Sequence, residues 1–141
     1  MTEEADPRRK LLAEIGDIND FSLARPLVSL ESFFLGNDDY GSIGYNFYPD
    51  QPSPSEFFEL FAKIRSYSAV RDVLVQVQQH EEPDAWPSAD TIWIVTDASV
   101  EEVAGWLGDR FRADELFEGI PDGVQTIDVP AGCQAIGVWY D

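Results

Sequence analysis

The sequence predicts an α+β fold of the ferredoxin-like kind, a split βαβ (βαββαβ) sandwich preceded by an N-terminal helical arm. Three observations lead to this prediction. The run Asp90–Val95 is apolar on both parities, which is typical of a central strand covered on both faces. Ser53 and Ser99 each begin a Ser-x-x-Glu capping box, which indicates a helix start. The predicted elements follow one another as strand, helix, strand, strand, helix, strand.

The chain has 141 residues, which favours a single domain, and its hydrophobic content of 44% is enough for a packed core. We expect residues 1–26 to form a helical arm and linker, and residues 27–141 to form one α+β domain. In the arm, Asp6 can cap a helix that begins at Pro7 and continues with an apolar stripe to Ile18. Residues 19–26 are interpreted as a linker, because Pro26 disfavours a helix just before it.

The first half of the predicted domain consists of short elements and turns. Residues 29–35 could form a short helix capped by Ser29 or a strand, and the run is too short to decide between them. Ser42–Tyr48 alternates with the period of a strand and is predicted as the first strand of the sheet. A helix from Ser53 to about Tyr67 and a strand at Asp72–Gln79 follow, and an acidic loop leads to the central strand.

The second half is predicted to contain one helix and one strand. The helix covers residues 100–107, residues 109–132 are irregular with a short turn at 113–117, and Gln134–Tyr140 closes the chain as a strand. Right-handed crossovers then give the strand order fourth, first, third, second. This order places Ser42–Tyr48 beside Asp90–Val95 at the centre of the sheet.

The formal net charge is −18 and is unevenly distributed. From Asp72 to Asp141 there are 15 acidic residues, against only Arg110 and Arg112. Such a surface repels nucleic acid and anionic lipid and attracts basic proteins, so we expect a basic protein partner, no nucleic acid and no membrane. The alternative is that the charge serves only to keep the protein soluble.

The sequence offers few residues for metal, phosphate or nucleophilic chemistry. One His and one Cys are too few for a zinc site, and Asn37-Asp38-Asp39 does not follow the calcium-loop spacing. No glycine-rich phosphate motif is present, and His80 lies beside two Glu residues in a predicted loop. We therefore predict no cofactor, no metal and no catalytic residue, although acid–base chemistry by a pair of carboxylates stays open.

The predicted compartment is the cytoplasm. The acidic start, Met-Thr-Glu-Glu, does not have the pattern of a signal peptide, and no apolar run approaches the roughly 18 residues of a membrane span. Cys133 is the single cysteine, so no disulfide is expected within the chain.

The second face of the predicted sheet is the candidate binding site. If the valines of Asp72–Gln79 pack under the helices, the opposite parity presents aromatic rings and amides, which suit a binding surface. The predicted binding residues are Asn46, Tyr48, Gln76, Gln78, Trp93 and Trp139. Alternatively, this face is simply covered, either by the segment Asp6–Leu35 or by a second subunit in a homodimer, because its tryptophans form a larger apolar patch than a soluble monomer usually exposes.

Several stretches carry a resemblance to known proteins. They are Ser29–Asn46 (SLESFFLGNDDYGSIGYN), Trp86–Thr91 (WPSADT), Glu102–Leu107 (EVAGWL) and Val138–Asp141 (VWYD). Over residues 27–141 the chain resembles small acidic bacterial proteins of unassigned function. In size, acidity and single-domain build it is also similar to immunity proteins of bacterial toxin systems. Neither resemblance supplies catalytic residues.

Two functions follow from these patterns. The first is a non-enzymatic acidic binding protein, of the immunity or inhibitor type, whose partner is a basic protein. The second is a small-molecule-binding protein or an enzyme that uses the aromatic face of the sheet.

Overall fold

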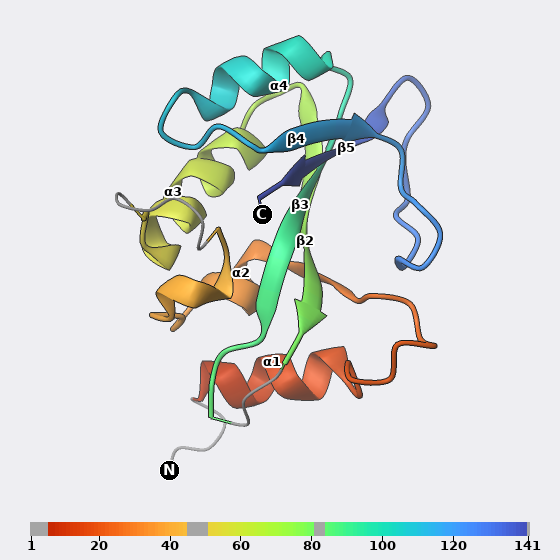
Figure 1. Ribbon diagram of the computed structural model, residues 1–141. Helices are drawn as coiled ribbons and strands as arrows, with labels where there is room; N and C mark the ends of the chain where they lie inside the picture. Colours follow the sequence, from red (N-terminus) through yellow and green to blue (C-terminus); the bar gives the residue numbers. More distant parts are fainter. Residues whose placement is uncertain (1–5, 45–50, 81–83, 141) are drawn as a thin grey trace.

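The protein has an α+β fold built on one five-stranded antiparallel sheet (Figure 1). The computed structural model describes residues 6–44, 51–80 and 84–140. The strand order across the sheet is β1-β2-β3-β5-β4. The strands are β1 (Leu27–Ser29), β2 (Val70–Gln79), β3 (Ser88–Thr96), β4 (Glu115–Glu118) and β5 (Gln134–Trp139). The described helices are α1 (Pro7–Ile15), α2 (Leu30–Phe34), α3 (Pro54–Arg65) and α4 (Val100–Leu107), with a short 3-10 helix, η2, at Tyr40–Ser42.

The prediction of a central strand is confirmed, but the predicted ferredoxin-like strand order is wrong. β3 is the third of five strands, and its neighbours are β2 on one side and β5 on the other. Along Thr91–Thr96 both of its edges are therefore occupied, and β5 lies where the predicted order placed Ser42–Tyr48. Ser42 belongs to η2, Ile43 forms a single parallel bridge with Ala89, and residues 45–48 lie outside the described residues.

The start of the predicted strand forms η2 because of a capping side chain. The Asp39 carboxylate accepts a hydrogen bond of 2.9 Å from the backbone N–H of Gly41, which caps η2 and turns the chain. A strand was also missed in the sequence analysis. Residues 113–117 were predicted to form a short turn, whereas β4 pairs with β5 and forms an edge of the sheet.

The predicted helix starts are confirmed in detail. The Ser53 hydroxyl accepts from the backbone N–H of Glu56 at 3.2 Å, and the Glu56 carboxylate accepts from the N–H of Ser53 at 2.9 Å. Ser99 and Glu102 make the same reciprocal pair at the start of α4. The alternatives for residues 29–35 are resolved in favour of a short helix, because Ser29 ends β1 and also caps α2.

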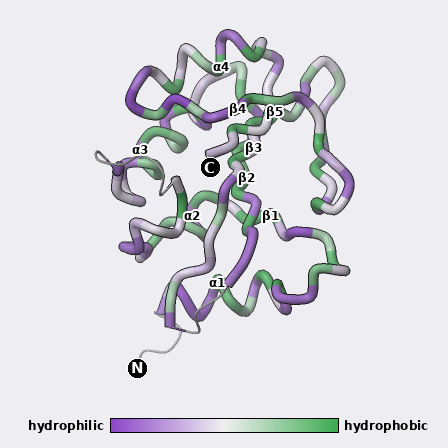
Figure 2. The backbone as a smooth tube through the Cα atoms, in the orientation of Figure 1, coloured by the Kyte–Doolittle hydropathy of each residue, from purple (hydrophilic) through white to green (hydrophobic). Residues whose placement is uncertain are grey.

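One face of the sheet carries the hydrophobic core, and we call it the helix-covered face. Val73, Val75 and Val77 of β2 are fully buried there, as the alternation of that strand predicts. β3 and β5 contribute Ile92, Ile94, Ile136 and Val138, and α2 and α3 contribute Phe33, Phe57, Phe61 and Ile64. α2 and α3 lie on this side of the sheet (Figure 1), and hydrophobic segments run through the middle of the molecule (Figure 2).

The leading segment packs with the rest of the chain. Leu11 and Ile15 of α1, together with Ile18, belong to the same buried cluster as Val28 and Phe33, and α1 contacts both α2 and β1. On the second face, Trp93 packs against Phe117 of β4. That residues 6–35 cover part of this face stays a prediction.

The segment read as a linker is held by a buried arginine. Arg25 is only 7% exposed, and its guanidinium donates to four backbone carbonyls, among them Ile18 at 2.8 Å and Gln78 at 2.9 Å. Its own backbone joins the loop between β4 and β5, because the N–H of Arg25 donates to the carbonyl of Gly123 at 2.7 Å. Two segments far apart in the sequence thus meet beside the sheet on the side opposite α2 and α3 (Figure 1).

Candidate functional site

The second face of the sheet, which we call the open face, brings together four of the six predicted binding residues. Gln76 and Gln78 of β2, Trp93 of β3 and Trp139 of β5 share this side, opposite the buried valines. Asn46 and Tyr48 lie outside the described residues. The parity argument was therefore sound for β2, β3 and β5, although the fold prediction from which it came was wrong in its strand order.

Strand register arranges the open face in two rows. Along one row, Glu115 of β4 lies opposite Trp139, Trp139 opposite Thr91, and Thr91 opposite Gln76. Directly opposed residues on one face lie within side-chain contact distance of each other. The next row consists of Phe117, Gly137, Trp93 and Leu74.

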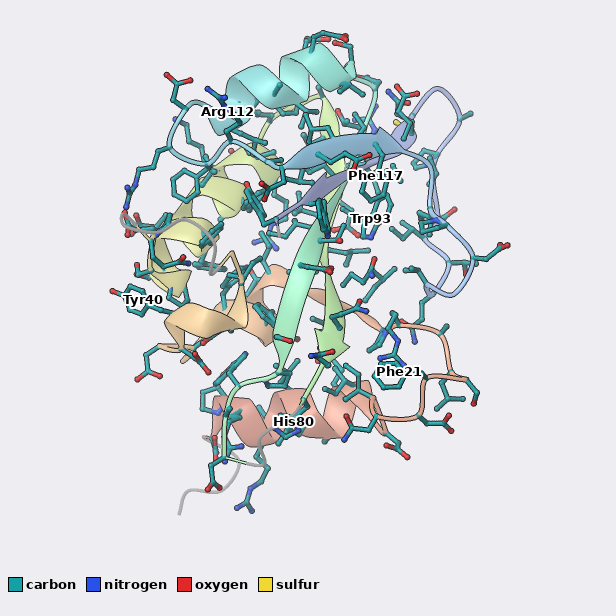
Figure 3. All side chains as sticks on the ribbon, viewed as in Figure 1. Phe21, Tyr40, His80, Trp93, Arg112 and Phe117 are labelled. Carbon is teal, nitrogen blue, oxygen red and sulfur yellow. The ribbon has the colours of Figure 1, made fainter. Side chains whose placement is uncertain are left out.

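Trp93 is the anchor of the second row and is fully buried, contrary to the expectation of an exposed tryptophan patch. Its ring meets Phe117 edge to face, with 5.2 Å between ring centroids, on the same side of the sheet as Phe21 (Figure 3). Its indole N–H donates to the Gln76 side-chain oxygen at 2.9 Å, and the Gln76 amide donates to the Gln78 side-chain oxygen at 3.2 Å. This chain of hydrogen bonds satisfies the buried polar groups and fixes both amides.

Gly137 makes this arrangement possible. A Cβ at this position would lie 2.8 Å from the Phe117 ring and 3.0 Å from the Trp93 ring, which is closer than side chains approach. The two rings therefore close over the glycine. The Phe117 ring also lines a depression beside the first row.

This open-face depression has a volume of about 350 Å³, within the range of small-ligand sites. It is lined by Gln76, Gln78, Asp90, Thr91, Glu115, Phe117, Pro121 and Trp139. A register shift between Gln76 and Val77 brings Asp90 next to Thr91 at this surface, as β-bulges commonly do near binding sites. The lining thus combines a partly exposed indole, a phenyl ring, two amides and two carboxylates.

Sequence reasoning missed Asp90, Glu115 and Phe117 as members of the site. For β4 the sequence carries little signal, because residues 115–118 read polar, apolar, apolar, polar and do not alternate with the period of a strand. For Asp90 the sequence carries no signal, since the bulge arises from how β2 and β3 pair.

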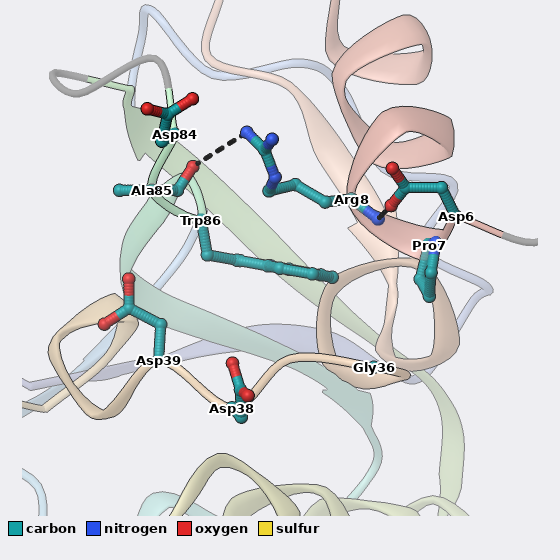
Figure 4. A pocket seen from close by; sticks show the side chains of 9 residues that line it. All are labelled: Asp6, Pro7, Arg8, Gly36, Asp38, Asp39, Asp84, Ala85 and Trp86. Carbon is teal, nitrogen blue, oxygen red and sulfur yellow. Dashed lines mark hydrogen bonds between the residues drawn. The ribbon is translucent and has the colours of Figure 1, made fainter. Parts of the chain in front are cut away.

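A second hollow, which we call the Trp86 pocket, has a volume of about 410 Å³. It lies where the start of α1, the turn after α2 and the loop before β3 meet (Figure 4). Asp6, Asp38, Asp39 and Asp84 line it together with Arg8, which donates to the Ala85 carbonyl at 3.5 Å. The Trp86 ring runs toward Pro7 and Gly36 (Figure 4) and is only 8% exposed, and its indole N–H is buried without an acceptor among the described residues.

Two ion pairs lie on the other side of the sheet. Arg65 of α3 forms a two-pronged ion pair with Glu31 of α2, one contact of which is 2.9 Å, and these hydrogen bonds lower the pKa of the Glu31 carboxyl. Arg110 pairs with Glu56 at 3.0 Å. By contrast, residues 113–140 contain five acidic residues and no Lys or Arg.

Within residues 6–44, 51–80 and 84–140, no group of three or more His, Cys, Asp or Glu side chains is arranged to hold a metal ion. In the same residues, no helix combines the length and the apolar character that crossing a bilayer requires. Burial raises the pKa of the Tyr140 hydroxyl, which donates to the Phe111 carbonyl at 2.8 Å on the helix-covered face.

Comparison with known proteins agrees with the resemblance to small bacterial proteins of unassigned function. The model of the "Uncharacterized protein YfbO family" matches residues 6–138. The chain is 39% identical over 128 residues to "Uncharacterized protein YfbO" of Escherichia coli (strain K12). The aligned residues cover 89% of this chain and 90% of that protein. No solved structure matches the chain. The similarity to immunity proteins stays a prediction.

Proposed function

Since this chain belongs to the uncharacterized YfbO family, we propose a function from its own residues: it is a non-enzymatic binding protein, of the immunity or inhibitor type, whose partner is a basic protein. The observation that carries this proposal is the excess of acidic over basic residues in β4 and the loop that follows it. Five acidic residues and no Lys or Arg occur between Ala113 and Tyr140. The paired arginines Arg65 and Arg110 have their partners on α2 and α3.

A surface of one sign raises the rate of association with a partner of the opposite sign by roughly 10- to 1,000-fold, and salt removes this gain. Solubility alone does not require carboxylates to line a depression together with aromatic rings. The combination of unpaired carboxylates with Trp139 and Phe117 therefore favours a partner over simple solubility.

The test compares two triple variants that remove the same amount of charge. Glu115→Gln/Asp122→Asn/Asp128→Asn alters the open side, and Glu14→Gln/Asp17→Asn/Glu59→Gln alters exposed carboxylates elsewhere. Each immobilised protein is incubated with cell lysate at about 50 mM and about 500 mM salt, and the bound proteins are identified by mass spectrometry.

We expect the wild type and the second triple variant to retain the same basic protein at low salt and to release it at high salt, while the first triple variant retains little. If no basic protein binds to the wild type at low salt, or if both triple variants lose it equally, the proposal is wrong.

The depression itself supports a second candidate, a small-molecule-binding protein or enzyme, because its volume and aromatic lining suit a ligand. Screening metabolites by thermal shift tests it. A ligand of this site should raise the melting temperature of the wild type and not that of Trp139→Ala. A ligand whose effect survives Trp139→Ala binds elsewhere.

A further inference from the structure

We propose that the open-face depression receives an arginine side chain of the basic partner, and this inference rests on the function proposed above. The guanidinium group would lie against the Trp139 indole, between the carboxylates of Glu115 and Asp90. The argument has three parts: where the carboxylates lie, which of their oxygens are available, and why the surface suits arginine better than lysine.

The placement follows from the backbone. Glu115 and Trp139 are direct cross-strand partners on the same face, so the carboxylate lies beside the indole. On the other side of Trp139 the cross-strand partner is Thr91, and the bulge sets Asp90 next to it. Trp139 thus lies between two acidic side chains that line the same hollow.

Asp90 and Glu115 both have carboxylate oxygens that can accept a hydrogen bond from a ligand. One oxygen of Asp90 accepts from the Thr91 hydroxyl at 2.9 Å, and no hydrogen bond to its other oxygen occurs within the described residues. Glu115 makes no ion pair with any described residue. The described lining of the depression includes no Lys, Arg or His, so the chain itself supplies no cation there.

The carboxylates alone would not define a site, since the Trp86 pocket has more of them. What distinguishes the depression is the Trp139 ring, which is mostly buried but keeps part of its surface accessible, with Phe117 and Pro121 beside it. A cation over an aromatic face is stabilised by the ring, more so when it is partly removed from water. The negative charge and the ring therefore select the same kind of ligand, a cation with a flat apolar surface.

Arginine meets these requirements better than lysine. Its guanidinium is planar, stacks on aromatic rings, and directs five N–H donors outward in its own plane, which suits acceptors on opposite sides. Glu115 and Asp90 supply acceptors on the two sides of Trp139, and the Gln78 side-chain oxygen, which already accepts from Gln76, adds a third. A lysine ammonium is a compact, strongly hydrated charge that would use the ring less well.

The experiment uses three small probes on the full chain: N-acetyl-arginine methylamide, its lysine counterpart, and its citrulline counterpart, which is a neutral isostere of arginine. Binding is followed by two-dimensional ¹H–¹⁵N NMR titration of the backbone amides of β4 and β5 and of the Trp139 indole N–H, assigned by its loss in Trp139→Phe. The variants are Glu115→Gln and, as a control, Glu59→Gln on α3, which removes the same charge elsewhere.

We expect the arginine probe to shift the Trp139 and Glu115 signals saturably, the lysine probe to bind several-fold more weakly, and the citrulline probe not to bind. Loss of one charge-assisted hydrogen-bonding partner in Glu115→Gln should weaken the arginine probe by about 10-fold. Glu59→Gln should bind as the wild type does. An unchanged NMR spectrum away from the site shows that each variant is folded.

The inference is overturned if citrulline or lysine binds as well as arginine, if Glu59→Gln and Glu115→Gln weaken binding equally, or if the shifted signals lie away from β4 and β5. Absence of binding by the arginine probe, when the lysate experiment does retain a basic protein, would refute the arginine site and leave the proposed function standing. Binding of the probe without a basic protein partner would refute the proposed function instead.

Discussion

The two faces of the sheet are built from the same three strands and differ in what they carry. On the helix-covered face, β2, β3 and β5 present valine and isoleucine, and the four aromatic rings of Phe33, Phe57, Phe61 and Tyr140 pack there. On the open face the alternate residues of the same strands include glutamine, threonine, tryptophan, glycine and one leucine, Leu74. The first face supplies most of the buried apolar side chains. The second face combines the packed Trp93 and Phe117 rings with polar groups held in fixed positions, which binding requires.

Comparing the Trp86 pocket with the open-face depression shows that acidic residues alone do not make a site for a cationic ligand. In the Trp86 pocket, four aspartates surround a tryptophan that is almost completely buried, and the protein contributes its own arginine, Arg8. In the open-face depression, two glutamines and two carboxylates surround Trp139, which keeps part of its ring accessible. Of the two, only the second offers both an unpaired charge and a ring that a ligand can reach.

The largest effect is expected from the helix-covered face. Phe57 is fully buried and meets the rings of Phe111 and Tyr140 at 5.2 Å and 5.4 Å between centroids. Phe57→Ala should lower the free energy of unfolding by about 3–5 kcal/mol, because it removes apolar contacts and leaves a cavity. Urea denaturation measures this loss. Trp139→Ala on the open face should cost clearly less, and equal losses would show that the open face also supports the fold.

An intermediate effect is expected from Gly137 on the open face. Gly137→Ala places a methyl group against the Phe117 and Trp93 rings, so it should lower the free energy of unfolding by about 1–3 kcal/mol. Displacing the rings should also red-shift tryptophan fluorescence.

Two further variants test this reason. Removing the obstructing ring in Gly137→Ala/Phe117→Ala should make the cost of the first substitution smaller, as a double-mutant cycle would measure. Gly105→Ala in α4 is the matched control, because a Cβ there meets nothing within 4 Å, and it should stabilise by about 0.5–1 kcal/mol. If Gly137→Ala is as harmless as Gly105→Ala, the rings do not depend on the glycine.

Much of the fold could be predicted from local patterns. Capping residues and hydrophobic periods correctly placed α1, α3, α4, β2, β3 and β5, because these signals depend on neighbouring residues. Strand order depends on pairings between distant residues, which carry no local signature. The predicted place of Ser42–Tyr48 beside β3, where β5 lies, and the missed pairing of β4 with β5 are both errors of this kind.

The candidate site could likewise be predicted only where the signal was local. Gln76, Gln78, Trp93 and Trp139 could be predicted as one face because alternation within a strand is local. The burial of Trp93 could not, since it depends on Phe117 and on Gly137 across two neighbouring strands. Arg25 was hidden inside an apparent linker, because its four carbonyl acceptors come from a loop and from the end of β2.

The smallest effect on the free energy of unfolding is expected from the Glu31–Arg65 ion pair on the helix-covered side. Glu31 and Arg65 pair between α2 and α3, and the hydrogen bonds from Arg65 lower the pKa of the Glu31 carboxyl from its ordinary value of 4.5. A carboxyl whose pKa is lower in the folded protein adds stability above the unfolded pKa. That stability is lost as the pH falls through the folded pKa. The pair should therefore weaken below about pH 4.5.

Because the two side chains are 32% and 44% exposed, water screens the pair, and its contribution should be at most about 1 kcal/mol. The free energy of unfolding of the wild type should fall more steeply than that of Glu31→Gln between about pH 6 and about pH 3, by no more than this amount. Urea denaturation across that range measures the difference. At pH 7, Glu31→Gln should be less stable than the wild type, whereas Glu115→Gln, which breaks no ion pair, should stay within about 0.5 kcal/mol of it. Parallel pH curves for the wild type and Glu31→Gln would mean that the ion pair adds nothing, and a large loss in Glu115→Gln would mean that this carboxylate is part of the fold and is not held available for a partner.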